Sequence, residues 1–168
     1  MTQLARALGA KHAISSTTNH SKAAQAKALG FKEVIDTSLE KLSDGVRRIT
    51  DNYGAEIVID GIGGEFLSQA LKALGFGGSL MTLGYSASRK TTIDVTDLIM
   101  PQAGIRSLNM FRQTQETITD AWNAIASLLQ SRAIKPIVAK TFPLVEAAEA
   151  LRYLVDEGRP FGRVVLTV

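Results

Sequence analysis

Three runs of helix-forming residues end in the same tripeptide, Ala-Leu-Gly, and a short apolar segment follows each of them. The three glycines are Gly9, Gly30 and Gly75. Glycine adopts the left-handed conformation that closes many helices. The three apolar segments are residues 12–16, 33–36 and 79–84. Short apolar runs of this kind, bounded by turn residues, are typical of strands buried on both faces of a parallel sheet. The alternation of helix and strand therefore predicts an α/β fold.

The same alternation continues along the rest of the chain. The spacing of apolar residues predicts helices over about 39–52, 65–74, 95–100 and 117–131. Strands are expected over 56–60 and 105–111, the second at a sheet edge. The last part is predicted to form a strand over 136–142, a helix over 143–157, a turn over 158–162 and a strand over 163–168. We expect two domains, residues 1–133 and the smaller unit 134–168.

Composition excludes several classes of protein. The 168 residues include no cysteine and two histidines, so disulfide scaffolds, thiol nucleophiles and a histidine-rich metal centre are not expected. The net charge of +3 comes from basic residues interleaved with acidic ones, which argues against nucleic acid as a partner. No apolar run is long enough to span a membrane and no secretory signal opens the chain, so a cytoplasmic protein is expected.

Three segments carry a resemblance to a known family. They are ARALGAKHAISSTTNHSKAAQAKALGFKEVID, EIVIDGIGGEFLSQALKALGFGGSLMTLGYS and FPLVEAAEALRYLVDEGRPFGRVVLTV. In this order and spacing they resemble the C-terminal half of a medium-chain dehydrogenase/reductase. Among the branches of that superfamily, the chain is most similar to the zinc-independent quinone oxidoreductases and enoyl reductases.

The resemblance implies a Rossmann-type parallel sheet with helices on both faces, followed by the last strand–helix–strand of the catalytic domain. In the family, a glycine-rich loop between the first strand and the first helix holds the cofactor pyrophosphate. The segment ARALGA corresponds to the end of that helix. The first strand and the glycine-rich loop therefore have no counterpart here, and we expect the two strands beside the missing one to face an unpaired gap.

Hydroxyl side chains cluster where the first predicted strand ends. They are Ser15, Ser16, Thr17 and Thr18, with Asn19 next to them. Lys22 follows one turn into the next helix. NAD sites place a carboxylate at this point for the ribose hydroxyls, and that carboxylate would repel a 2′-phosphate. Hydroxyls with an ammonium group favour NADPH over NADH. The alternative is that these serines and threonines only cap the helix.

The resemblance adds one match and one departure at this end of the sheet. In the quinone oxidoreductases, a lysine at the position of Lys22 and a tyrosine shortly after the next strand help to hold the phosphate. Lys22 matches the lysine, whereas Thr37 stands at the position of the tyrosine.

Glycines follow the strand expected over 56–60, but their spacing is not that of a dinucleotide fingerprint. The third glycine of such a motif would fall at Phe66, and no acidic residue lies at the expected distance beyond it. We interpret Gly61 and Gly63 as a turn whose backbone lies close to the cofactor. A purely structural turn is the alternative.

The resemblance also places nicotinamide contacts in the loop after residues 79–84 and near residue 111. The candidates are Leu83, Gly84, Tyr85, Ser86, Met110, Phe111 and Arg112. Tyr85 covering a sheet edge and Arg112 capping a neighbouring helix are equally open. Arg163 or Arg159 could reach the cofactor, with a solvated turn as the alternative.

Two functions remain open at this point. The resemblance implies hydride transfer from NADPH to a small electrophile, such as a quinone, an enone or an enoyl substrate, with no zinc. No residue is assigned as the catalytic acid or base, and Asp36 and Asp60 are expected to cap turns. The alternative is a non-catalytic nucleotide-binding-type domain that assembles with a partner. A homodimer is expected, joined through residues 105–111 or by closing the gap in the sheet.

Overall fold

Helices and strands alternate through the computed structural model, which describes residues 1–156 and 160–168. The helices are α1 (Thr2–Ala7), α2 (His20–Ala28), α3 (Leu42–Ile49), α4 (Glu65–Lys72), α5 (Thr96–Ile99), α6 (Gln115–Gln130) and α7 (Ala147–Asp156), with 3₁₀ turns η1 (Met110–Arg112) and η2 (Leu144–Glu146). The strands are β1 (Ser15–Thr17), β2 (Val34–Asp36), β3 (Ala55–Asp60), β4 (Leu74–Thr82), β5 (Gly104–Ser107), β6 (Val138–Pro143) and β7 (Arg163–Thr167). The predicted α/β class is confirmed.

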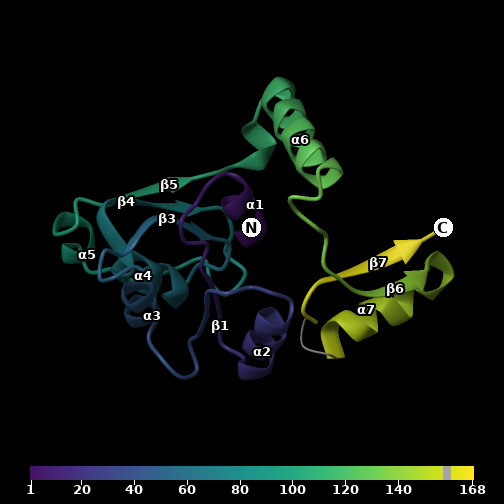
Figure 1. Ribbon diagram of the computed structural model, residues 1–168, viewed down its shortest axis with the longest axis horizontal. Helices are drawn as coiled ribbons and strands as arrows, with labels where there is room; N and C mark the ends of the chain where they lie inside the picture. Colours follow the sequence, from purple (N-terminus) through teal and green to yellow (C-terminus); the bar gives the residue numbers. More distant parts are fainter. Residues whose placement is uncertain (157–159) are drawn as a thin grey trace.

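The strands form three parallel sheets (Figure 1). β1 pairs with β2, β4 lies between β3 and β5, and β6 pairs with β7. Thr17 at the end of β1 is opposite Asp36 at the end of β2, and Asp60 at the end of β3 is opposite Thr82 of β4. Parallel pairing in this register brings the carboxyl ends of neighbouring strands to one edge.

The predicted gap in the sheet is present. Within the described residues, no backbone ladder joins β1 to β3, so the two sheets are separate. On β3, Ile57 and Ile59 share one face and remain 71% and 47% exposed. Val58 lies on the opposite face, where it packs against the cluster that contains Leu80. One face of this sheet is therefore covered and the other is open.

Small side chains let the helices approach the sheets. Ala23 and Ala26 of α2 pack against Val34 of β2. On the second sheet, Ala70 and Leu71 of α4 are buried with two residues of β4. A third cluster of Ile35, Val46 and Ala73 joins the first sheet to α3 and to the end of α4.

The helix-closing glycines behave as predicted in two of three cases. Gly9 and Gly30 have φ values of +92° and +88° directly after α1 and α2. Gly75 is different because β4 already begins at Leu74, and a β-bulge follows before the regular ladder. A Cβ on Gly75 would lie 2.5 Å from the Tyr53 carbonyl oxygen, so this glycine permits close backbone approach rather than closing a helix. The strand therefore begins five residues earlier than predicted.

Several predicted elements are shorter in the structure. The first strand is one of them, since β1 covers Ser15–Thr17 rather than residues 12–16. α3 ends at Ile49 rather than near residue 52, because Asp51 and Asn52 adopt positive φ values of 51° and 67°. The strand expected over 105–111 ends at Ser107. A 3₁₀ turn follows it, started by the Asn109 side chain, which accepts a hydrogen bond from the Phe111 N–H at 3.0 Å.

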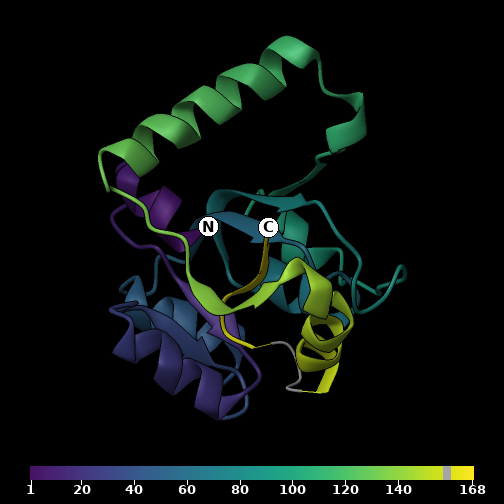
Figure 2. The ribbon, with the colours of Figure 1, turned by 90° about the vertical axis from the view of Figure 1, so that its right-hand side faces the viewer.

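The long helix α6 forms as predicted, but its apolar stripe is not covered. The Thr114 hydroxyl caps it by accepting from the Thr117 N–H. No residue of α6 is buried, and Trp122 is 65% exposed. In Figures 1 and 2, α6 stands clear of the sheets.

The C-terminal part forms the predicted strand–helix–strand unit, with β6 and β7 parallel and α7 between them in sequence. The ring of Phe161 packs edge-on against Phe31 at a centroid distance of 6.1 Å. The Gln3 side chain bonds both the N–H and the carbonyl of Lys135, at 2.6 and 3.0 Å. Gly158 and Arg159 of the predicted turn lie outside the described residues, and the domain boundary at residue 133 stays a prediction.

Candidate functional site

The carboxyl edge of the β1–β2 and β3–β4–β5 sheets holds most of the residues that the sequence singled out. Thr17, Asp36, Asp60 and Thr82 all lie at strand ends on this side. Ligands of open α/β sheets bind beyond the carboxyl ends of the strands, because the loops that follow are free to carry polar groups. The loops after β1, β2, β3 and β4 therefore define the candidate site.

The end of β1 exposes hydroxyl groups beside the start of α2. Asn19 caps this helix, its side chain accepting from the Lys22 N–H at 3.0 Å. Thr17 takes part in the same turn, since its hydroxyl accepts from the Asn19 N–H at 3.2 Å. Ser16 is exposed next to them, and the first turn of α2 contains no acidic residue. The helix cap is thus an asparagine, which leaves the serines of β1 outside the capping bond.

A histidine–carboxylate pair at the end of β2 was not foreseen. The His20 Nδ1 lies 2.7 Å from the Asp36 Oδ2. The other oxygen of Asp36 accepts from the N–H and the hydroxyl of Ser38, at 3.0 and 2.5 Å. Asp36 therefore caps the turn after β2, as expected, and it also binds an imidazole. The available signal was the position of both residues, each just beyond one of two neighbouring strands.

The hydrogen bonds of Asp36 keep it ionised. The Ser38 hydroxyl lowers the pKa of the Asp36 carboxyl group most strongly, and His20 lowers it further by hydrogen bonding and by charge. Burial opposes both effects, but the pKa stays below its ordinary value. Thr37 ties this turn to β1, because its hydroxyl donates to the Thr17 carbonyl at 3.1 Å.

The loops after β3 and β4 pack directly on each other. The Asp60 carboxylate accepts from the N–H groups of Ile62 and Gly63, as expected for a turn cap. Gly63 also forms a parallel bridge with Ser88. A Cβ on Gly63 would lie 2.7 Å from the Ser88 carbonyl oxygen and 3.1 Å from the Tyr85 Cα. Loop packing alone therefore requires glycine at this position.

Five of the candidate residues meet in this loop pair. They are Gly61, Gly63, Leu83, Gly84 and Tyr85. The Leu83 N–H donates to the Asp60 carbonyl at 2.8 Å, which fixes the second loop against the first. Tyr85 is 64% exposed, and the Arg89 guanidinium lies 5.4 Å from its ring centroid.

The remaining candidates lie on other elements. Phe111 and Arg112 belong to the turn η1 beyond β5, where Phe111 is fully exposed. Arg163 is the first residue of β7, and its N–H donates to the Ile137 carbonyl at 2.8 Å. None of these contacts tests the expected role of the three residues in cofactor binding, so that role stays a prediction.

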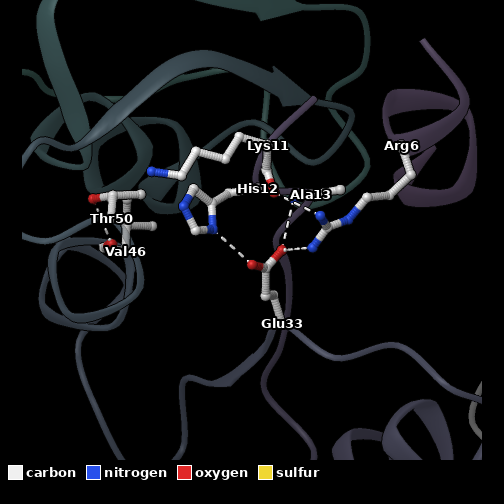
Figure 3. A network of polar contacts seen from close by, with 7 residues as sticks. All are labelled: Arg6, Lys11, His12, Ala13, Glu33, Val46 and Thr50. Carbon is white, nitrogen blue, oxygen red and sulfur yellow. Dashed lines mark hydrogen bonds and ion pairs between the residues drawn. The ribbon is translucent and has the colours of Figure 1, made fainter. Parts of the chain in front are cut away.

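A second polar network lies at the opposite, amino end of β1 and β2 (Figure 3). The Glu33 carboxylate accepts from the Ala13 N–H at 2.7 Å, pairs with the Arg6 guanidinium and lies 2.7 Å from the His12 Nδ1. Burial alone would raise the pKa of Glu33, but the bonds from His12 and Ala13 and the charge of Arg6 outweigh it and lower the pKa. Arg6 also donates to the Lys11 carbonyl. This network joins α1 to the first sheet.

Comparison with known proteins agrees with the fold. A family model described as zinc-binding dehydrogenase matches residues 1–127. Quinone oxidoreductase 1 of Escherichia coli (strain K12) is 31% identical over 155 residues, which cover 88% of this chain and 46% of that protein. A crystal structure of 2-haloacrylate reductase has a TM-score of 0.82 at 29% identity, covering 100% of this chain and 53% of its own. One of an NAD-dependent alcohol dehydrogenase has a TM-score of 0.78 at 29% identity, covering 99% of this chain and 46% of its own.

The fold and its carboxyl-edge loops are therefore those of the C-terminal half of a medium-chain dehydrogenase/reductase. Within that superfamily, the chain belongs to the zinc-binding dehydrogenase family. It spans about half the length of the relatives named above.

The family name refers to zinc, but the described residues do not fit this metal. The chain has no cysteine. Among residues 1–156 and 160–168, no group of three or more histidine or acidic side chains could hold a metal ion.

No helix of this described part has the length and apolarity needed to cross a membrane.

Proposed function

We propose that this chain is the nucleotide-binding part of an NADPH-dependent oxidoreductase that reduces a small electrophile, such as a quinone, an enone or an enoyl substrate. The observation that carries the proposal is the end of β1. Exposed hydroxyl groups lie there, Lys22 lies in the first turn of α2, and that turn contains no acidic residue. The names of the relatives, quinone oxidoreductase and 2-haloacrylate reductase, agree with this class of reaction.

Each part of the carboxyl edge would have a separate task. Ser15, Ser16 and Thr17 would donate hydrogen bonds to the oxygens of a 2′-phosphate, and Lys22 would provide a positive charge. The bound NADPH supplies the hydride. The packed loops after β3 and β4 would orient the rest of the dinucleotide through backbone groups. Glycine at position 63 lets these two loops approach each other and so sets the shape of that surface.

Nucleotide titration tests the proposal directly. The full 168-residue chain is titrated with NADPH and with NADH, and binding is followed by nicotinamide fluorescence. We expect tighter binding of NADPH, and about tenfold weaker binding after Lys22→Ala because a phosphate contact is lost. Lys27→Ala is the matched control, since Lys27 lies in the last turn of the same helix. Equal affinity for both nucleotides, or equal effects of the two substitutions, would contradict NADPH selectivity.

A second function is favoured by the open sheet edges. β1 and β3 are not paired with each other, the β3 residues Ile57 and Ile59 are exposed, and all four residues of the edge strand β5 are exposed. Unpaired strand edges associate with other chains. In this alternative the domain assembles with a partner or a second copy and does not catalyse a reaction.

Association through the edge strand is tested separately from nucleotide binding. Sedimentation of the purified chain measures its association, and Ile105→Lys on β5 introduces a charge at the edge. A dimer that dissociates on this substitution supports association through β5. A monomer at all concentrations would exclude the homodimer.

A further inference from the structure

The pair of His20 and Asp36 has no task in the function proposed above. We propose that His20, held by Asp36, is the residue that lets the site discriminate a 2′-phosphate from a free 2′-hydroxyl, and that this discrimination weakens as the pH rises. The inference rests on the proposed function, because it assumes that the adenosine end of a dinucleotide lies at the ends of β1 and β2.

The carboxylate of Asp36 lies close to the end of β1. Asp36 lies opposite Thr17 in the β1–β2 register, and Thr37 is bonded to the Thr17 carbonyl. A negative charge therefore lies one strand away from Ser16, the exposed serine of β1. By itself this carboxylate would repel a phosphate bound at the end of β1.

The imidazole of His20 lies between this carboxylate and the solvent. The side chain of His20 is 75% exposed, whereas that of Asp36 is 9% exposed. The imidazole is thus the solvent-facing member of the pair. Because Nδ1 lies 2.7 Å from the carboxylate, Nε2 is on the far side of the ring and is directed away from Asp36. A ligand approaching the pair from solvent meets the imidazole.

The net charge of the pair depends on whether the imidazole is protonated. Ser38 and His20 keep the carboxylate ionised, so the pair is neutral when the imidazole is protonated and carries one negative charge when it is not. A protonated imidazole also presents an N–H donor at Nε2, whereas the neutral ring bonded through Nδ1–H has lost it. Histidines change charge between about pH 5 and pH 8. Two other polar groups belong to this region: Lys22, further along α2, and Ser38, which donates to Asp36.

The experiment separates the phosphate from the rest of the nucleotide. The 168-residue chain is titrated calorimetrically with 2′,5′-ADP and with 5′-AMP, which differ in the 2′-phosphate, at about pH 6 and pH 8. We expect 2′,5′-ADP to bind about tenfold more tightly at the lower pH, and this ratio to fall at least threefold at the higher pH. His20→Ala should remove most of the preference at about pH 6 and change it little at about pH 8, while the affinity for 5′-AMP stays the same.

Two further variants control the measurement. His20→Arg keeps a positive charge next to Asp36 at both pH values, so it should retain the preference and reveal the pH dependence that comes from the phosphate itself. His12→Ala removes the other histidine–carboxylate pair, at the opposite end of the strands, and should leave the ratio unchanged. Circular dichroism establishes that each variant is folded.

The outcomes distinguish the inference from the function on which it rests. If His20→Ala retains the preference while Lys22→Ala loses it, the role of His20 is wrong and the phosphate site stands. A pH dependence in His20→Arg as steep as in the unmodified chain also overturns the inference. If the unmodified chain binds neither nucleotide up to about 10 mM, the proposed function fails for this chain, and the inference fails with it.

Discussion

Two histidine–carboxylate pairs lie at opposite ends of the β1–β2 sheet, with the same 2.7 Å separation between Nδ1 and the carboxylate oxygen. In the amino-end pair, Glu33 also binds the Ala13 N–H and Arg6, and the His12 side chain is 28% exposed. In the carboxyl-end pair, the Asp36 side chain is covered but His20 is 75% exposed.

The difference shows how surroundings decide the role of identical chemical groups. At the amino end, the carboxylate of Glu33 accepts from three protein donors on two neighbouring segments, so the network stabilises the fold. At the carboxyl end, the protein engages one nitrogen of His20 and leaves the ring facing solvent. The first pair is a structural connection, and the second has capacity for a ligand.

Disrupting β2, which follows Glu33 and ends at Asp36, should have the largest effect. Ile35 lies between Val34 and Asp36 on β2 and is 0% exposed. Ile35→Ala should lower the free energy of unfolding by about 3–4 kcal/mol, because it removes buried apolar surface and leaves a cavity. Urea denaturation measures this loss. The control is Leu29→Ala, at a position that is 57% exposed. A loss below about 1 kcal/mol would mean that β2 does not belong to the folded core.

Removing the amino-end carboxylate should have the next largest effect. Glu33→Ala leaves the Ala13 N–H, Arg6 and His12 without their shared partner, so we expect a loss of about 2–3 kcal/mol. Glu40→Ala is the control, because it breaks the more exposed ion pair with Arg48 and should cost much less. Equal midpoints for the two variants in urea would show that the network adds nothing beyond an ordinary surface pair.

Lowering the pH should destabilise the fold through both pairs. The pKa of Glu33 and that of Asp36 are lowered in the folded chain, so folding favours the ionised carboxylates. Their contribution is complete above the ordinary carboxyl pKa of about 4 and is lost as the pH falls through the lowered values. The urea midpoint measured from neutral to acidic pH should therefore fall, and Glu33→Gln should flatten this dependence. An unchanged slope in Glu33→Gln would refute the contribution of Glu33.

The smallest expected effect on stability is the difference between replacing His12 and replacing His20. His12→Ala should cost about 1 kcal/mol, because a partly buried carboxylate loses one of its donors. His20→Ala should cause no measurable change in thermal stability, since the imidazole is largely exposed and Ser38 still binds Asp36. Thermal denaturation of both variants near neutral pH makes the comparison. A larger loss from His20→Ala would reverse the roles assigned to the two pairs.

Much of the fold follows from local sequence. The apolar runs predicted parallel strands, Gly9 and Gly30 predicted the ends of two helices, and the resemblance predicted the gap between β1 and β3. These features were predictable because they depend on neighbouring residues or on the known order of strands. The capping roles of Asp36 and Asp60 were predicted for the same reason.

Other features depend on contacts between distant residues. The sequence predicted that Gly75 closes a helix. In the structure this residue instead lies against the Tyr53 carbonyl, where a Cβ would not fit. The spacing of apolar residues over 117–131 predicted a helix, yet Trp122 of α6 is exposed because no element of the described chain covers it. The roles of the candidate site residues in binding stay predictions, although the structure does bring the residues after β3 and β4 together.

The sequence alone determined the α/β alternation, the ends of α1 and α2 and the hydroxyl-rich end of β1, since periodicity and backbone preferences act over a few residues. Only the tertiary structure decided which polar groups became partners. His20 and Asp36 are 16 positions apart, and His12 and Glu33 are 21 apart. Their pairing depends on the parallel register of β1 and β2, which sets Thr17 opposite Asp36 and brings the ends of two distant segments together.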